Sequence, residues 1–283
     1  MQHSKLFISY IDTCFKKFNE GLADYFSSGE VKPLFKMRVN IKKLRASLKC
    51  IEHYYGEKKF KKSRKQFKEI FMKGGYLREL RKYEDWCRKH SLIRVATWIR
   101  LDDAIKKQEE EFEKIRDKIT KWADEIKKLM VDHARNLSQE DVYQFYLLLV
   151  EERMSLFFKE TKKNNFHAFR KEIKRILYAR HWQDERGLQI VSKRQAVFLD
   201  QYQHLIGNWH DHEEMGERLR KQKAIHVGNR TTANQKAAFE KAFQLIDNTI
   251  HQLYEKVLAK QRSCAEIMRP VVKRIENARK KSA

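Results

Sequence analysis

Two segments of the chain carry rows of basic side chains whose spacing suits the binding of an extended anion. The first begins at "FKMRVNIKKLR" (Phe35–Arg45), and its cations, at steps of four, three and four residues, are Arg38, Lys42, Arg45 and Lys49. This spacing holds the four side chains on one side of an α-helix. Each cation comes directly after an apolar residue, so the row borders the buried stripe at about 100° around the helix axis.

The second row lies in "FHAFRKEIKRILYARHW" (Phe166–Trp182). Its members, at the same helical spacing or directly beside it, are His167, Arg170, Lys171, Lys174, Arg175 and His181. Like charges so spaced repel by about 0.2–0.5 kcal/mol per pair, and partial burial adds to this cost. No acidic residue lies between Arg38 and Lys49, and only Glu172 lies near the second row. We therefore expect an anionic ligand to supply the missing counter-charge.

The next helix along the chain adds a further basic side. This side is formed by Arg64, Lys68, Gly75, Arg78 and Lys82. The matching positions in the second half of the chain are not basic; they are Asp200, Gly207, His210 and Glu214. Two roles stay open for acidic residues such as Glu79 and Asp211. They either pair with Arg170 or Arg175 to hold the rows in position, or they belong to the site itself.

The composition predicts both the fold class and the kind of partner. Only 2 Pro and 9 Gly occur among 283 residues, and helix-forming residues recur in periodic order, which predicts an all-α fold of long helices. The formal net charge of +24 attracts nucleic acid, anionic membranes or polyphosphates. A charge that only keeps the protein soluble is the alternative, but solubility would not require the charges to form rows.

Cysteines and apolar runs bear on chemistry and location. The four cysteines form no CxxC pair, so we expect small buried thiols in a reducing compartment and no zinc cluster. The longest apolar run, "VYQFYLLLV" (Val142–Val150), is far shorter than the roughly 20 residues of a membrane span. No signal peptide is recognisable, and a cytoplasmic location is expected.

About eight helices are expected. Their approximate ranges are 6–26, 33–55, 58–89, 91 or 102 to 136, 139–160, 164–185, 190–222 and 231–262. Gly74-Gly75 is expected to interrupt or bend the third, and Ser138 is expected to start the fifth. The sequence does not decide whether the basic tail, Lys273–Lys281, is ordered, and a frayed, solvated end is the default.

The two halves of the chain repeat each other at a constant offset of 132 positions (170 − 38 and 207 − 75). At this offset Arg38, Lys42, Lys43, Gly75 and Glu79 correspond to Arg170, Lys174, Arg175, Gly207 and Asp211. A constant offset across two helices and their connection predicts an internal duplication of a four-helix unit. We expect a first repeat over 1–137 and a second over 138–283, which together form one domain of two pseudo-symmetric four-helix bundles with a basic central cleft.

The same offset aligns the predicted core. In the first repeat the apolar stripes are Leu34, Met37, Ile41, Leu44, Leu48 and Ile51, then Phe67, Ile70 and Leu77. In the second they are Phe166, Phe169, Ile173 and Ile176, then Leu199, Tyr202 and Trp209. Their three-four spacing is typical of buried helix faces.

These motifs resemble the CHAD family, the conserved-histidine α-helical domain, over nearly the whole chain. One family pattern, H-x-x-R-x-x-x-[RK]-R-[LI]-R, is similar to Phe35–Arg45 and to "HAFRKEIKRIL" (His167–Leu177). A second, near G-x-x-[HR]-D, is similar to "GYLRE" (Gly75–Glu79) and "GNWHD" (Gly207–Asp211). The first repeat departs from the family pattern with Phe35 in place of histidine, and the second with Leu177 in place of the last arginine, so a lopsided site is expected.

The resemblance implies binding of inorganic polyphosphate in a basic cleft and association with polyphosphate granules, without catalysis. Together, motif and spacing give the candidate binding residues Arg38, Lys42, Lys43, Arg45, Lys49, Arg78, His167, Arg170, Lys171, Lys174, Arg175 and His210. We expect no cofactor, no metal and no catalytic residue. His167 and His210 are expected to gain protons beside phosphate, so that affinity rises below neutral pH; for His210 a hydrogen-bonded core residue is the alternative.

Two other functions stay open as alternatives. A metal-dependent phosphohydrolase would gather residues such as His167, His210, Asp211 and His212, although His210 and His212 lie about 200° apart on a helix and neighbouring arginines repel a metal. Sequence-independent nucleic-acid binding would use the same phosphate-binding rows. The sequence disfavours it because no aromatic platform is evident among the basic residues. Membrane docking is disfavoured because the apolar faces are predicted to form the core.

Overall fold

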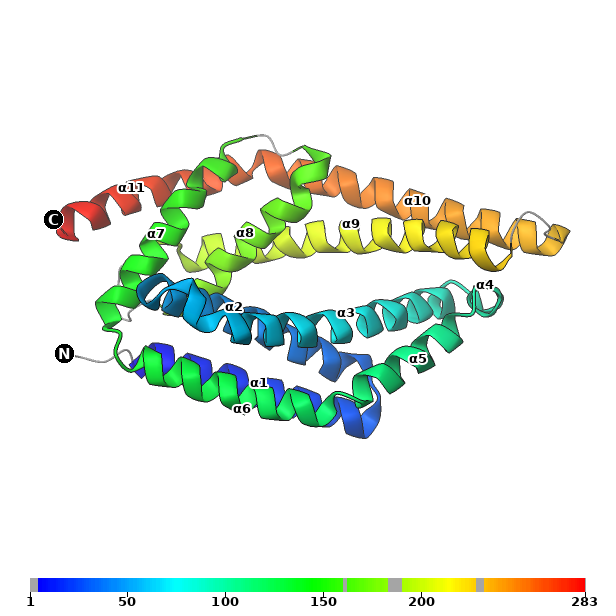
Figure 1. The fold of residues 1–283 in the computed structure, drawn as a ribbon. Helices are drawn as coiled ribbons and strands as arrows, with labels where there is room; N and C mark the ends of the chain where they lie inside the picture. The colour runs from blue at the N-terminus through cyan, green and yellow to red at the C-terminus, as the bar shows by residue number, and fades with distance from the viewer. Residues whose placement is uncertain (1–4, 160–161, 183–189, 228–231, 283) are drawn as a thin grey trace. The chain divides into compact units, whose positions relative to one another are not determined.

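The computed structural model describes residues 5–159, 162–182, 190–227 and 232–282. These residues form helices and short connections without a β-strand, which confirms the predicted all-α class (Figure 1). No helix of the described chain is both long and apolar enough to cross a membrane. The helices form because apolar residues recur at helical spacing and few prolines or glycines interrupt them.

The chain divides into two compact units, which we name after their basic helices. The α2 unit comprises the described residues of Ile8–Ala134 and Met215–Ile246. The α8 unit comprises the described residues of Met1–Phe7, Arg135–Glu214 and Asp247–Ala283. Helices α9 (Lys193–His226) and α10 (Ala233–Arg262) each contribute one part to each unit. The predicted repeats over 1–137 and 138–283 stay a prediction.

The α2 unit is built around α2 and α3, which pack along each other (Figure 1). Its own helices are α1 (Lys5–Ser28, shared at its first residues), α2 (Val31–Tyr55), η1 (Glu57–Phe60), α3 (Lys61–Lys89), α4 (Ile93–Trp98), α5 (Leu101–Glu113) and α6 (Arg116–Ala134). Helix α3 also packs against α4, α5 and α6.

In the α8 unit, α7 packs against both α8 and α11. Its own helices are α7 (Gln139–Phe157), η2 (Lys163–Asn165), α8 (Phe166–Ala179), η3 (Arg180–Trp182) and α11 (Cys264–Ser282). Ser138 caps α7 as predicted: its hydroxyl accepts from the backbone N–H of Asp141, whose carboxylate accepts in return from the backbone N–H of Ser138.

The structure bears on three of the expected boundaries. Helix α3 runs without interruption through Gly74 and Gly75, so the expected interruption is absent and a bend at this point stays a prediction. The single helix expected to end near 136 is three helices, and the break between α4 and α5 falls at Arg100, whose φ of 51° lies in the left-handed region. The C-terminal residues form α11 rather than a frayed tail, because its apolar side, with Val271 and Ile275, is buried.

The predicted core is confirmed on every stripe. Each of its members is at most 5% exposed, from Leu34 on α2 to Trp209 on α9. The four cysteines are buried and free, as expected of small apolar residues. These packed stripes fix the rotation of α2 and α8, and therefore the direction in which the neighbouring cations point.

Candidate anion-binding site

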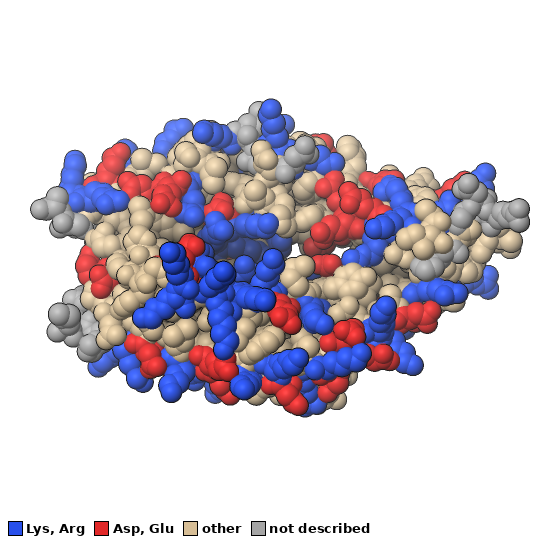
Figure 2. Space-filling model, in the orientation of Figure 1, with Lys and Arg blue, Asp and Glu red and all other residues tan. Residues whose placement is uncertain are grey.

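Three cations of α2 converge on one aromatic ring of α3. The Cζ of Arg38 lies 4.0 Å from the ring centroid of Phe71. The Nζ of Lys42 lies 5.2 Å and the Cζ of Arg45 lies 5.7 Å from the same centroid. A phenyl ring attracts cations through its quadrupole but carries no net charge, so Phe71 gathers the three cations without neutralising them. Figure 2 shows Lys and Arg side chains gathered where Figure 1 draws α2.

Arg38 anchors this group to the backbone of α3. It is only 7% exposed, and its Nη1 donates a hydrogen bond to the backbone carbonyl of Phe71. A Cβ atom at position 75 would lie 2.9 Å from the Cζ of Arg38, closer than real Cβ contacts. Gly75 therefore makes room for the guanidinium. Arg38 is thus buried, whereas the sequence placed it at the border of the buried stripe.

The α8 unit repeats this contact. The Nε of Arg170 donates to the backbone carbonyl of Gln203 at 2.9 Å. A Cβ atom at position 207 would lie 2.7 Å from the Cζ of Arg170, so Gly207 makes room for this guanidinium in the same way. Arginine, carbonyl and glycine all recur at the predicted offset of 132. This gives the glycine of the second motif a physical role.

A second pair of contacts recurs at the same offset with different residues. In the α8 unit the rings of His167 and His210 meet edge to face, with centroids 4.3 Å apart. In the α2 unit the corresponding residues are Phe35 and Arg78, and the Cζ of Arg78 lies 5.3 Å from the phenyl centroid. The α8 unit thus has two titratable rings where the α2 unit has a phenyl ring and a permanent cation. The two units therefore differ at these positions, in line with the expected lopsided site.

His167 lies in a strongly cationic environment. Burial, and after it the charges of His210, Lys171, Arg170 and Lys174, together lower its pKa from 6.5 to about 4. Its Nδ1 is buried without a hydrogen-bond partner. In the unliganded protein His167 is therefore neutral near pH 7. An anion beside it would favour the charged form.

Carboxylates already pair with two of the predicted binding residues. Lys49 contacts Glu52 and Glu57, each at 3.0 Å. The Nη1 of Arg175 lies 2.6 Å from Glu172, which also pairs with Arg153. The expectation that Lys49 lacks counter-charges is therefore wrong, because the glutamates that follow it in the sequence fold back onto it.

The pairing of Asp211 with Arg170 or Arg175 stays a prediction, whereas two other acidic residues near the second motif have defined partners. Glu79 pairs with Arg218 of α9 at 3.5 Å, and Glu214 lies 3.7 Å from the Nε2 of His210.

The remaining predicted cations differ in how far they are exposed and in what they contact. Lys171 is exposed and Lys174 is half-buried on α8. The charge of Lys43 on α2 acts on the Cys14 thiol of α1. Burial raises the pKa of this thiol, and Lys43 partly offsets the rise.

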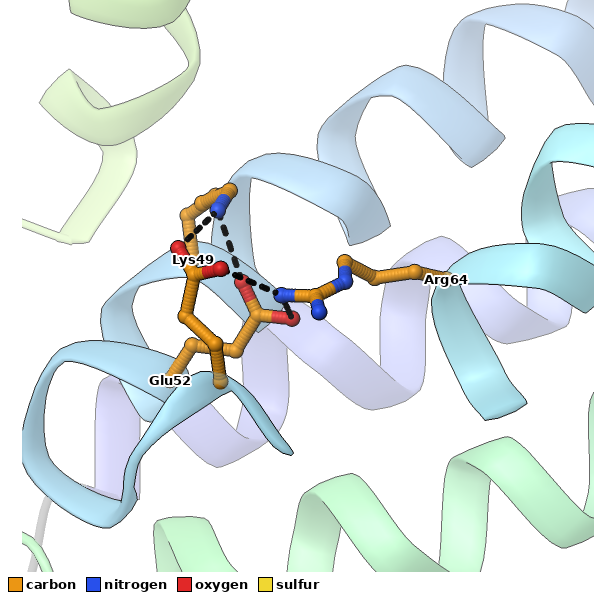
Figure 3. A network of polar contacts seen from close by, with 4 residues as sticks. Lys49, Glu52 and Arg64 are labelled. Carbon is orange, nitrogen blue, oxygen red and sulfur yellow. Dashed lines mark hydrogen bonds and ion pairs between the residues drawn. The ribbon is translucent and has the colours of Figure 1, made fainter. Parts of the chain in front are cut away.

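Sequence reasoning missed two members of the site. Phe71 is the ring at which the cations of α2 meet, so the expectation that no aromatic residue lies among them is wrong. The available signal was its position, one helical turn before Gly75. Arg64 was placed on a basic side of its helix but not assigned to the site; it joins Lys49 through Glu52 (Figure 3).

The described residues form no group of side chains suited to a metal ion. Among them, no three or more His, Cys, Asp or Glu side chains are grouped so that they could hold a metal ion. His210 and His212 also have different partners: His210 faces His167, whereas the Nδ1 of His212 lies 2.7 Å from the carbonyl of Asn208.

Comparison with known proteins adds a family and a fold. A sequence profile of the CHAD domain matches residues 9–220. Among solved structures, the crystal structure of the CHAD domain from the plant Ricinus communis is similar, with a TM-score of 0.64 at 15% identity. That alignment covers 93% of this chain and 92% of the plant chain, and at this identity it concerns the fold. No curated protein sequence matches.

Proposed function

The chain belongs to the CHAD family, and on that premise we propose that it binds inorganic polyphosphate through the cations of α2 and α8. The observation that carries the proposal is the convergence of Arg38, Lys42 and Arg45 on Phe71. The family has a known association with polyphosphate. The remaining support is physical and concerns the match between these side chains and a row of phosphates.

Polyphosphate offers roughly one negative charge per phosphate, with no base or sugar to recognise. A ligand of this kind needs cations at regular intervals and little else. Arginine can bind phosphate oxygens with two N–H groups, whereas lysine acts as a mobile point charge. Arg38 and Arg170 are fixed on backbone carbonyls, so they hold the rows in place. The more exposed Arg45 and Lys171 then supply the adaptable contacts.

We propose a binding role without catalysis, and targeting to polyphosphate granules in the cell. Metal-dependent hydrolysis is the alternative. It is tested by incubating the protein with polyphosphate and Mg²⁺ or Mn²⁺ and measuring the phosphate released. Release at a rate that depends on protein and metal would replace the binding proposal with an enzymatic one.

The proposal is tested by calorimetric titration with long-chain polyphosphate at several salt concentrations. We expect saturable binding. The logarithm of the binding constant should fall linearly with the logarithm of the salt concentration, because the protein's cations displace counterions from the polymer. Orthophosphate at the same phosphate concentration should bind far more weakly, since it cannot span a row. Absence of polyphosphate binding at low salt would contradict the proposal.

Single-stranded nucleic acid is a second candidate, which two aromatic residues favour. Phe71 lies among the cations of α2, and Phe35 is 43% exposed beside Arg78. Exposed aromatic rings within a cationic groove can stack on bases. Competition separates the candidates: polyphosphate should displace single-stranded RNA at equal phosphate concentration. Displacement of polyphosphate by RNA would favour nucleic acid.

A further inference from the structure

The end of the α2 row contains two cations that share a buried carboxylate. Glu52 is 3% exposed, and its two oxygens lie 3.0 Å from the Nζ of Lys49 and 3.0 Å from the Nη1 of Arg64 (Figure 3). A carboxylate buried this deeply stays charged only if cations and hydrogen bonds compensate for its lost hydration. Glu52 therefore fixes one lysine of α2 and one arginine of α3 beside each other.

A second carboxylate bridges the same two cations from the solvent side. The Oε1 of Glu57 lies 3.0 Å from the Nζ of Lys49, and its Oε2 lies 3.1 Å from the Nη1 of Arg64. Unlike Glu52, the Glu57 side chain is 66% exposed. Hydrogen bonding to Lys49, together with the charges of Lys49 and Arg64, lowers the pKa of Glu57, so it is ionised near neutral pH.

The position and strength of the Glu57 contact make it replaceable. Exposed ion pairs contribute about 0–1 kcal/mol, because water and salt screen them. Lys49 lies one helical turn beyond Arg45 on the same side of α2, so a polymer bound at Arg45 would bring its next phosphates to Lys49 at high effective concentration. Two oxygens of one phosphate group could then take the places of Oε1 and Oε2.

We propose that Lys49 and Arg64 form a further phosphate subsite at the end of the α2 row, fixed by Glu52 and occupied in the free protein by the carboxylate of Glu57. A phosphate group of bound polyphosphate displaces Glu57 from the two cations. This inference rests on the proposed function, since the polymer must first bind along α2. Glu57 then acts as an internal competitor that weakens binding at this end of the row.

The test is calorimetry with long-chain polyphosphate on the Glu57→Gln variant. We expect about threefold tighter binding than in the unaltered protein, the size of one exposed ion pair, because the competing charge is gone. Glu20→Gln on α1 is the matched control. Glu20 is an exposed glutamate that pairs with Lys16, so the variant changes the net charge equally away from the row. The control should bind as the unaltered protein does.

A double variant assigns the gain to this subsite. In a Lys49→Met background, Glu57→Gln should give a clearly smaller gain, since one of the two cations that phosphate would contact is missing. Unchanged or weaker binding by Glu57→Gln would overturn the subsite, as would an equal gain in the Glu20→Gln control. If the unaltered protein bound no polyphosphate, the proposed function itself would fail, and the two results are thus distinguishable.

Discussion

The imidazole rings of His167 on α8 and His210 on α9 meet edge to face with their centroids 4.3 Å apart. Burial and the surrounding cations together lower the pKa of His167 to about 4. A histidine that is neutral in the folded protein but charged in the unfolded chain couples stability to pH. If phosphate lies beside it, the same histidine also couples ligand affinity to pH.

The stability of the unliganded protein should fall as the pH falls from about 6.5 to about 4. In this window the unfolded chain binds a proton at His167 and the folded protein does not, so the free energy of unfolding decreases. The expected loss between neutral pH and pH 5 is about 1–2 kcal/mol from this group, measured by urea unfolding. His167→Asn should lose this part of the pH dependence, whereas His251→Asn, at an exposed position of α10, should retain it. Equal pH dependence in His167→Asn would contradict the assignment.

Polyphosphate affinity should rise as the solution becomes more acidic. The bound polymer raises the pKa of His167 above its free value of about 4, so binding takes up a proton between the free and bound pKa values. Affinity is then lost as the pH rises through the bound pKa. Calorimetry from about pH 5.5 to 8 measures this trend. An affinity that does not change over this range, or a trend that His167→Asn retains in full, would count against it.

Gly75→Ala should destabilise the protein more than Gly74→Ala does. A Cβ at position 75 would meet the guanidinium of Arg38, which must leave its carbonyl, at a cost of about 1–3 kcal/mol for the buried hydrogen bond. A Cβ at position 74 would lie 3.1 Å from the flexible methyl end of Met37, which can move. Chemical denaturation compares the two variants. Equal losses of unfolding free energy in the two variants would show that the position of Arg38 does not depend on a glycine at position 75.

Much of the fold could be predicted because helical periodicity is a local property. The stripe from Leu34 to Ile51 predicted the buried side of α2, and the spacing of Arg38 and Lys42 followed from it. Helix α11 could also have been predicted, since Met268, Val271 and Ile275 recur at helical spacing. The basic residues between them obscured that pattern. The break at Arg100 had no such signal, because a non-glycine residue rarely adopts a positive φ.

The site was harder to predict because its contacts join distant segments. The offset matched Gly75 with Gly207, but only the packing of α2 on α3 shows that the glycine admits an arginine. Lys49 was assigned as an unpaired cation because Glu52 and Glu57 follow the row instead of interrupting it. The repeated arginine–glycine contacts support an internal duplication, and the predicted basic central cleft stays a prediction.

Charge reversal on α2 and α8 tests the central claim most directly. Calorimetry with long-chain polyphosphate compares the unaltered protein with a Lys42→Glu, Arg45→Glu, Lys171→Glu, Lys174→Glu variant. The matched control reverses two exposed lysines of α5, Lys106 and Lys107, and two of α6, Lys121 and Lys128, with folding checked by circular dichroism. The account predicts that the row variant loses at least about 100-fold in affinity while the control loses far less. A folded row variant that binds polyphosphate as tightly as the control would contradict it.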